Sequence, residues 1–168
     1  MFIEKPYLSN IESVNRELAV LSTYSIDTII NKLNESDQDV VGILDKFIHF
    51  GIELIQTTDE LLEEIIDIDA IYQFHITDLR FNFWIGVSKG KITYKKGFKN
   101  DTSIRIFFTR DLILKIFKGD ISGTEAYMKG WMKVNGNLSH AFKVKNFLRL
   151  LIDYMNVISK GKKNILRS

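Results

Sequence analysis

The 168-residue chain has no cysteine and one proline, Pro6. Without cysteine there can be no disulfide, no thiolate metal ligand and no cysteine nucleophile. The scarcity of proline and the lack of low-complexity tracts argue against long disordered segments. No apolar run approaches the roughly 18–20 residues that cross a bilayer. The first residues, Met1–Pro6, lack the basic and apolar regions of a signal peptide. We therefore expect a cytoplasmic protein.

The charge of the chain is distributed unevenly. Residues 1–69 contain 4 basic and 15 acidic residues, whereas residues 70–168 contain 19 basic and 6 acidic ones. One interpretation is that the acidic part packs beside the basic part. The other is that a basic face stays open and attracts anionic membranes. We expect no nucleic-acid partner, because the basic stretch Lys89–Lys99 lies in predicted hairpin turns and lacks an aromatic stacking pattern.

Apolar residues recur at helical spacing through residues 9 to 69. The segment Asn10–Lys32 is predicted to be helical, and Val40–Gln56 places its apolar residues three and four apart on one face. Thr57-Thr58-Asp59-Glu60 matches a capping box. This pattern predicts a short helix that begins at Thr57 and continues through Ile66.

The period changes to two after residue 70, which predicts strands with one apolar face. They cover residues 72–76, 81–87, 92–96 and 103–108, and the short connections favour an antiparallel meander. His75 falls on the opposite face from Phe74, so we expect it to point away from the core. A further brief strand surrounds Met132 and Val134.

Helix signals return at Thr109, a predicted N-cap, and end at Gly119. Ser122-Gly123-Thr124-Glu125 is a second capping box that predicts another short helix. The last helix, from Ala141 to Ile158, carries two adjacent apolar stripes. Such a wide apolar arc predicts contact with two different parts of the protein.

The order of these signals resembles the sterol carrier protein 2 family. The residues that carry the resemblance are Asp111–Gly119, Ala126, Gly130–Asn137 and Ala141, in which a Gly–apolar–Lys–apolar–x–Gly segment precedes the final helix. The resemblance covers residues 40–158. It leaves residues 1–39 as an N-terminal helical extension and residues 159–168 as a basic C-terminal tail.

The resemblance implies an α/β fold of the α+β type, in which a mostly antiparallel five-stranded sheet with helices on one face encloses an apolar tunnel. It also implies non-catalytic binding or transfer of a lipid such as a fatty acid, an acyl chain, a sterol or an isoprenoid. The residues predicted to line the tunnel are Phe74, Phe83, Ile85, Ile106, Phe108, Ile113, Phe117, Met132, Phe142, Phe147 and Leu151. The alternative is that these side chains fill an ordinary core.

Catalytic and metal-binding patterns are scarce. His49, His75 and His140 stand apart in different elements, and none has a second histidine four residues later. The carboxylates of residues 60–67 have helical spacing but no histidine partner, which is typical of a solvated face. No Gly-x-Ser-x-Gly elbow, phosphate loop or dinucleotide fingerprint occurs. We expect no enzyme, no catalytic residue, no metal and no cofactor.

Two alternatives concern partners. Trp84 and Trp131 lie out of phase with the apolar strand faces. Either a helix covers them, or they form an exposed aromatic surface for a homodimer or a membrane. A second function also stays open, in which the fold acts through protein–protein contacts as a scaffold or accessory module in quinone or isoprenoid lipid biosynthesis.

Overall fold

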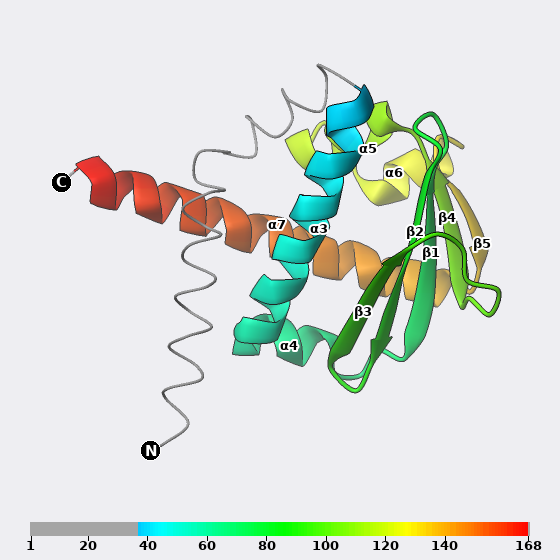
Figure 1. Cartoon of the computed structure of the whole chain (residues 1–168), viewed down its shortest axis with the longest axis horizontal. Helices are drawn as coiled ribbons and strands as arrows, with labels where there is room; N and C mark the ends of the chain where they lie inside the picture. Colours follow the sequence, from blue (N-terminus) through cyan, green and yellow to red (C-terminus); the bar gives the residue numbers. More distant parts are fainter. Residues whose placement is uncertain (1–36, 168) are drawn as a thin grey trace.

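The computed structural model describes residues 37–167, and side chains are described from Val40 to Tyr154 (Figure 1). Two helices, α3 (Asp37–Thr57) and α4 (Asp59–Ile65), precede the sheet. The predicted helices in residues 1–36 lie outside the described residues. The strands are β1 (Ala70–Ile76), β2 (Phe81–Ser88), β3 (Lys91–Lys96), β4 (Ile104–Phe108) and β5 (Lys133–Gly136). Helices α5 (Arg110–Lys118) and α6 (Gly123–Met128) separate β4 from β5, and α7 (Leu138–Arg167) follows.

The five strands form one sheet in the order β3-β2-β1-β4-β5, with β1 and β4 parallel and all other pairs antiparallel. The predicted α/β fold with a mostly antiparallel five-stranded sheet is confirmed. The predicted meander is wrong at β4, which pairs with β1 and not with β3. The chain therefore has to pass from one edge of the sheet across β2 and β1 before it forms β4.

The side chain of Gln73 holds the β3–β4 connection where it crosses the sheet. Its side chain is 1% exposed although it lies on the face of β1 opposite the core. Its amide nitrogen donates to the carbonyl of Gly97 at 3.0 Å, and its amide oxygen accepts from the backbone of Lys99 at 2.8 Å. Buried polar groups in proteins are almost always satisfied in this way. The connection between β3 and β4 is thus fixed across the outer face of the sheet.

The strand faces follow the predicted alternation. Phe74 lies opposite Phe83 on one side and Ile106 on the other, so the inner face is continuous across the three central strands. Helices α3, α4 and α7 lie on this side of the sheet (Figure 1). The most deeply buried apolar side chains include Phe50 of α3, Leu61 of α4, Ile76 of β1 and Ile104 of β4.

The helix ends confirm most of the predicted caps. Thr109 Oγ1 accepts from the backbone nitrogen of Leu112 at 3.3 Å, and Ser122 Oγ accepts from that of Glu125 at 3.0 Å. Gly119 ends α5 in the left-handed conformation. The prediction that Thr57 caps α4 is wrong. Thr57 is instead the last residue of α3, and its hydroxyl donates to the carbonyl of Glu53 at 2.8 Å.

Helix α7 is the longest described element, with 30 residues that span roughly 45 Å. It begins beside β4 and β5, passes α4, and continues beyond the sheet (Figure 1). The two predicted contacts of its wide apolar arc are therefore the sheet and the preceding helices. The helix runs through residues 159–167, where the sequence suggests a separate tail.

Candidate functional site

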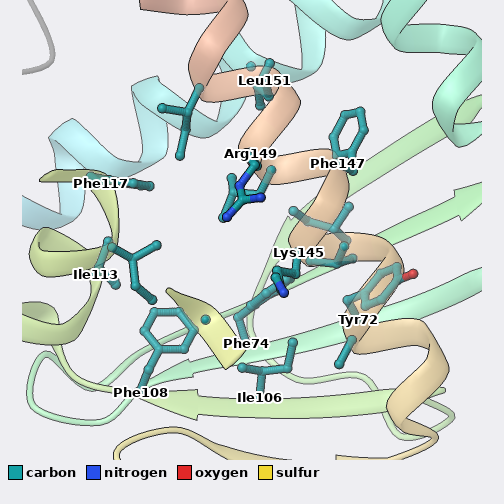
Figure 2. Close-up of a pocket in the computed structure, with 18 of the residues that line it drawn as sticks. Tyr72, Phe74, Ile106, Phe108, Ile113, Phe117, Lys145, Phe147, Arg149 and Leu151 are labelled. Carbon is teal, nitrogen blue, oxygen red and sulfur yellow. The ribbon is translucent and has the colours of Figure 1, made fainter. Parts of the chain in front are cut away.

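A cavity of about 600 Å³ lies between the inner face of the sheet and helices α3, α5 and α7. Its floor is formed by inner-face side chains of β1, β2 and β4, and its opposite wall by α3 and α7 (Figure 2). Most of the lining side chains are apolar. This volume lies within the range of roughly 300–1,000 Å³ that is typical of small-molecule sites.

All eleven residues that the sequence predicts for an apolar tunnel line this cavity. They are Phe74, Phe83, Ile85, Ile106, Phe108, Ile113, Phe117, Met132, Phe142, Phe147 and Leu151. Phe83, Ile106 and Leu151 are buried, whereas the others keep part of their surface open. Phe83, Ile106 and Leu151 also belong to the buried core, and most of the others pack against it, so the same side chains contribute to the core and border the cavity. That they contact a ligand stays a prediction.

Aromatic rings form much of the wall. Phe74 stacks on Phe83 with ring centroids 4.9 Å apart, and its edge meets Phe108 at 6.2 Å. On the helical side, Phe47 of α3 meets Phe117 of α5 at 5.4 Å. Such ring pairs stabilise the wall by about 0.5–1.5 kcal/mol each beyond simple burial. They stabilise the packing of the strands and helices that surround the cavity.

The sequence interpretation missed the charged side chains at this cavity. Lys118 of α5 and three residues of α7, namely Lys145, Arg149 and Asp153, also line it. Figure 2 shows the nitrogen ends of Lys145 and Arg149 directed toward the space between α7, α5 and the sheet. Their spacing of four residues on α7 was visible in the sequence, but polar positions beside an apolar stripe are usually solvated.

Tyr72 adds one buried hydroxyl to the lining. The residue is 1% exposed, and its phenolic oxygen has no hydrogen-bond partner within the described part of the chain. The ring of His140 lies nearby, with the centroids 6.3 Å apart. Burial raises the pKa of Tyr72 to about 12 from its usual value of 10.0, because the phenolate would lose its hydration.

Replacing Tyr72 with phenylalanine should stabilise the protein at neutral pH by about 1 kcal/mol, because it removes an unsatisfied buried hydroxyl. The effect should also depend on pH. The wild-type tyrosine ionises first in the unfolded chain, so wild-type stability is complete below pH 10.0 and falls as the pH rises toward about 12. Urea unfolding at neutral pH and at about pH 11 would measure both effects.

The exposed Tyr127 provides the matched control. Tyr127→Phe should change the free energy of unfolding by less than about 0.5 kcal/mol. A Tyr72→Phe variant that loses more than about 1 kcal/mol would show instead that the Tyr72 hydroxyl has a stabilising partner.

The remaining histidines and tryptophans lie away from the cavity lining. His75 points to the outer face of the sheet, as predicted, where its ring stacks on Phe107 with centroids 4.4 Å apart. Trp84 shares that face and lies beneath the Lys99 ammonium, which is 4.6 Å from the ring centroid. Trp131 is 49% exposed. Lys99 belongs to the β3–β4 connection, which therefore reaches Trp84 on the outer face, whereas α3, α4 and α7 lie on the opposite side of the sheet (Figure 1).

Among the side chains that the structure describes, from Val40 to Tyr154, no group of three or more histidine, cysteine, aspartate or glutamate residues is placed to hold a metal ion. None of the helices within residues 37–167 is both long enough and apolar enough to cross a membrane.

Solved structures of known proteins share the fold. Apo sterol carrier protein 2 from Yarrowia lipolytica has a TM-score of 0.52 at 20% identity, covering 64% of this chain and 88% of that one. A double mutant of the sec-alkyl sulfatase PisA1, an enzyme described from Pseudomonas sp., has a TM-score of 0.52 at 17% identity. That match covers 63% of this chain but only 16% of the sulfatase. At these identities the similarity shows the fold alone.

The ubiquinone synthesis protein UbiJ-SCP2 has a TM-score of 0.44 at 9% identity, covering 55% of this chain and 74% of that one. No curated protein sequence matches the chain. The sequence profile of the SCP-2 sterol transfer family matches residues 52–149, which is more than half of the chain and includes most of the cavity wall. The protein therefore belongs to the SCP-2 sterol transfer family.

Proposed function

We propose that this protein binds the hydrocarbon part of a lipid in its cavity and carries it without changing it chemically. The observation that supports the proposal is the cavity of about 600 Å³ with a nearly continuous apolar wall. An apolar chain that enters this space leaves water, and burial of apolar surface is the main driving force for such binding. The ligands that fit are a fatty acid, an acyl chain, a sterol or an isoprenoid.

The expected affinity follows from the length of the buried chain. Each buried methylene group contributes about 0.8 kcal/mol, so a chain of about 16 carbons provides considerably more than the roughly 8 kcal/mol of a micromolar complex. Part of this gain offsets the loss of translational, rotational and chain freedom on binding. Micromolar binding therefore requires no covalent or metal contact.

A carrier also needs a surface that meets membranes, and the segment from α6 to the start of α7 has the required chemistry. Most of the large apolar side chains that are exposed in the described structure gather here. We call them the α6–α7 apolar patch: Tyr127, Met128, Trp131, Leu138 and Phe142. Tyr127, Leu138 and Phe142 also line the cavity, so the patch adjoins the cavity.

The surroundings of Trp131 favour an anionic membrane. The ammonium groups of Lys115 and Lys129 lie 5.5 and 4.9 Å from the centroid of its ring. An amphipathic aromatic residue beside lysines suits the boundary between lipid headgroups and acyl chains. A lysine near an anionic surface contributes up to about 1 kcal/mol of attraction, and less where it also pairs with a carboxylate, as Lys115 does with Asp111 and Lys129 with Glu125. We infer that the α6–α7 apolar patch contacts anionic bilayers when the lipid enters or leaves.

Transfer of a fluorescent fatty acid between vesicles tests both parts of this proposal. The protein should accelerate transfer between phosphatidylglycerol vesicles, and Trp131→Ala should slow the accelerated rate about fivefold because it removes the interfacial anchor. Binding of the fatty acid in the absence of vesicles should not change.

Phe98 provides the control, since it is also an exposed aromatic residue, at 71%, but lies on the outer face beside His75. Phe98→Ala should leave the transfer rate unchanged. Equal losses in both variants would contradict the assigned membrane surface. No acceleration by the wild-type protein would contradict the transfer function.

A further inference from the structure

The charge of the cavity wall is unbalanced. Its cationic side chains are Lys118, Lys145 and Arg149, and its carboxylate is Asp153. Lys118 and Arg149 are exposed and Lys145 is half-buried, so these cations stand at the solvent-facing edge of the apolar cavity, where they stay hydrated until an anion meets them. The headgroup of a bound lipid, and not its hydrocarbon tail, is therefore the part expected to lie next to these cations.

Lys145 and Arg149 are four residues apart, so they lie on the same side of α7. Both nitrogen ends are directed toward the cavity in Figure 2, Arg149 facing α5 and Lys145 facing the sheet. Lys145 is half-buried, its ammonium donates to the hydroxyl of Thr124, and its stem passes close to Gly123. These contacts hold the lysine at the edge of the cavity beside α6.

Neither side chain has an ionic partner in the described part of the chain, where every ion pair within 4.0 Å involves other cations. Other lysines in this region do have carboxylate partners one helical turn earlier. Lys115 pairs with Asp111 at 3.3 Å on α5. Lys129 pairs with Glu125 at 3.1 Å at the end of α6. Two cations that converge on one cavity without a carboxylate partner can both contact a single anion.

We propose that Lys145 and Arg149 form a subsite for the anionic headgroup, a carboxylate or a phosphate, of a single-chain amphiphile whose tail occupies the apolar cavity. The inference rests on the proposed lipid-binding function and specifies its ligand class. The arginine guanidinium contacts a carboxylate or phosphate with two parallel hydrogen bonds, and the lysine adds a point charge. A neutral lipid such as a sterol leaves both cations without an anionic partner.

Competition binding against a neutral fluorescent lipid tests the subsite. The probes are palmitate, hexadecyl phosphate and hexadecanol, which share a chain and differ in the headgroup. The wild-type protein should bind both anionic probes about tenfold more tightly than hexadecanol, because a charge-assisted contact of this kind is worth about a factor of ten. The double variant Lys145→Gln/Arg149→Gln should lose this preference and keep its affinity for hexadecanol.

The matched control is Lys143→Gln/Arg105→Gln, which removes the same charges from exposed positions that do not line the cavity. It should retain the preference for the anionic probes. If the first double variant fails to fold, Arg149→Gln alone should lower the preference about threefold, and Arg149→Lys should restore part of it.

The outcomes separate the two proposals. Equal binding of all three probes by the wild-type protein, or equal losses in test and control variants, would overturn the headgroup subsite and leave chain binding intact. No binding of any probe would overturn the proposed function itself. Inorganic phosphate should not displace palmitate at millimolar concentration; displacement would show a site for free anions and would also overturn the proposal.

Discussion

Replacing Ile113 with tryptophan is expected to weaken fatty-acid binding at least about tenfold while the protein stays folded. Ile113 lies on α5, is half-buried, and points into the cavity (Figure 2). The larger indole occupies space that a lipid chain would use. Exclusion of only two methylene groups costs about 1.6 kcal/mol, which corresponds to slightly more than a factor of ten. Displacement of a fluorescent fatty acid would measure the loss.

A matched substitution distinguishes a blocked cavity from general damage. Ile66, at the end of α4, is 49% exposed and does not line the cavity. Ile66→Trp makes the same chemical change and should leave binding unchanged. Because Ile113 borders open space, its replacement should destabilise the fold by less than the roughly 1–3 kcal/mol that is usual for overpacking. Unchanged lipid affinity in a folded Ile113→Trp protein would contradict the assigned cavity.

Replacing Gly136 with alanine is expected to lower the free energy of unfolding by about 3 kcal/mol or more. Gly136 ends β5 with a φ of 127°, a conformation that side chains disfavour. A Cβ at this position would lie 2.5 Å from the Ser103 carbonyl oxygen and 2.9 Å from the Ile104 Cα. Both are backbone atoms, so the clash cannot be relieved by rotation of a side chain. Chemical denaturation would measure the loss.

Gly42 provides a control of opposite sign. It lies on the exposed side of α3, and a Cβ there would meet nothing within 4 Å. Gly42→Ala should therefore raise the free energy of unfolding by about 0.5–1 kcal/mol, since alanine favours helix. A Gly136→Ala protein as stable as the wild type would show that β5 does not approach β4 as closely as described.

Gly136 also explains why the family resemblance could be recognised from the sequence. It closes the Gly130–Asn137 segment, in which Gly130 and Gly136 both adopt positive φ values. These glycines determine how the edge strand leaves α6 and meets β4. The Gly130–Asn137 motif is therefore specific because the backbone requires glycine at two positions, and it contains little information about the ligand.

The apolar face of the sheet could be predicted because strand periodicity records it directly. Phe74, Phe83 and Ile106 occupy matching positions on neighbouring strands, and all three reach the cavity as expected. The parallel pairing of β1 with β4 could not be predicted in this way. It depends on the β3–β4 connection, which is held by the buried amide of Gln73, and a single glutamine in a strand gives no sign of such a partner.

The charged edge of the cavity was missed for a related reason. Periodicity identifies the side of α7 that meets the core, and it assigns Lys145 and Arg149 to the solvated remainder. The cavity extends beyond the apolar stripe, however, so these two side chains border it as well. Only the arrangement of α5, α6 and α7 around a common space reveals them.

Native mass spectrometry of the full chain, purified without detergent, tests the central claim most directly. We expect protein with one bound lipid, which denaturation releases and which is identified as a single-chain amphiphile, and a much smaller bound fraction for Ile113→Trp than for Ile66→Trp. Lipid-free wild-type protein that also stays empty after incubation with palmitate, hexadecanol or a sterol would contradict it.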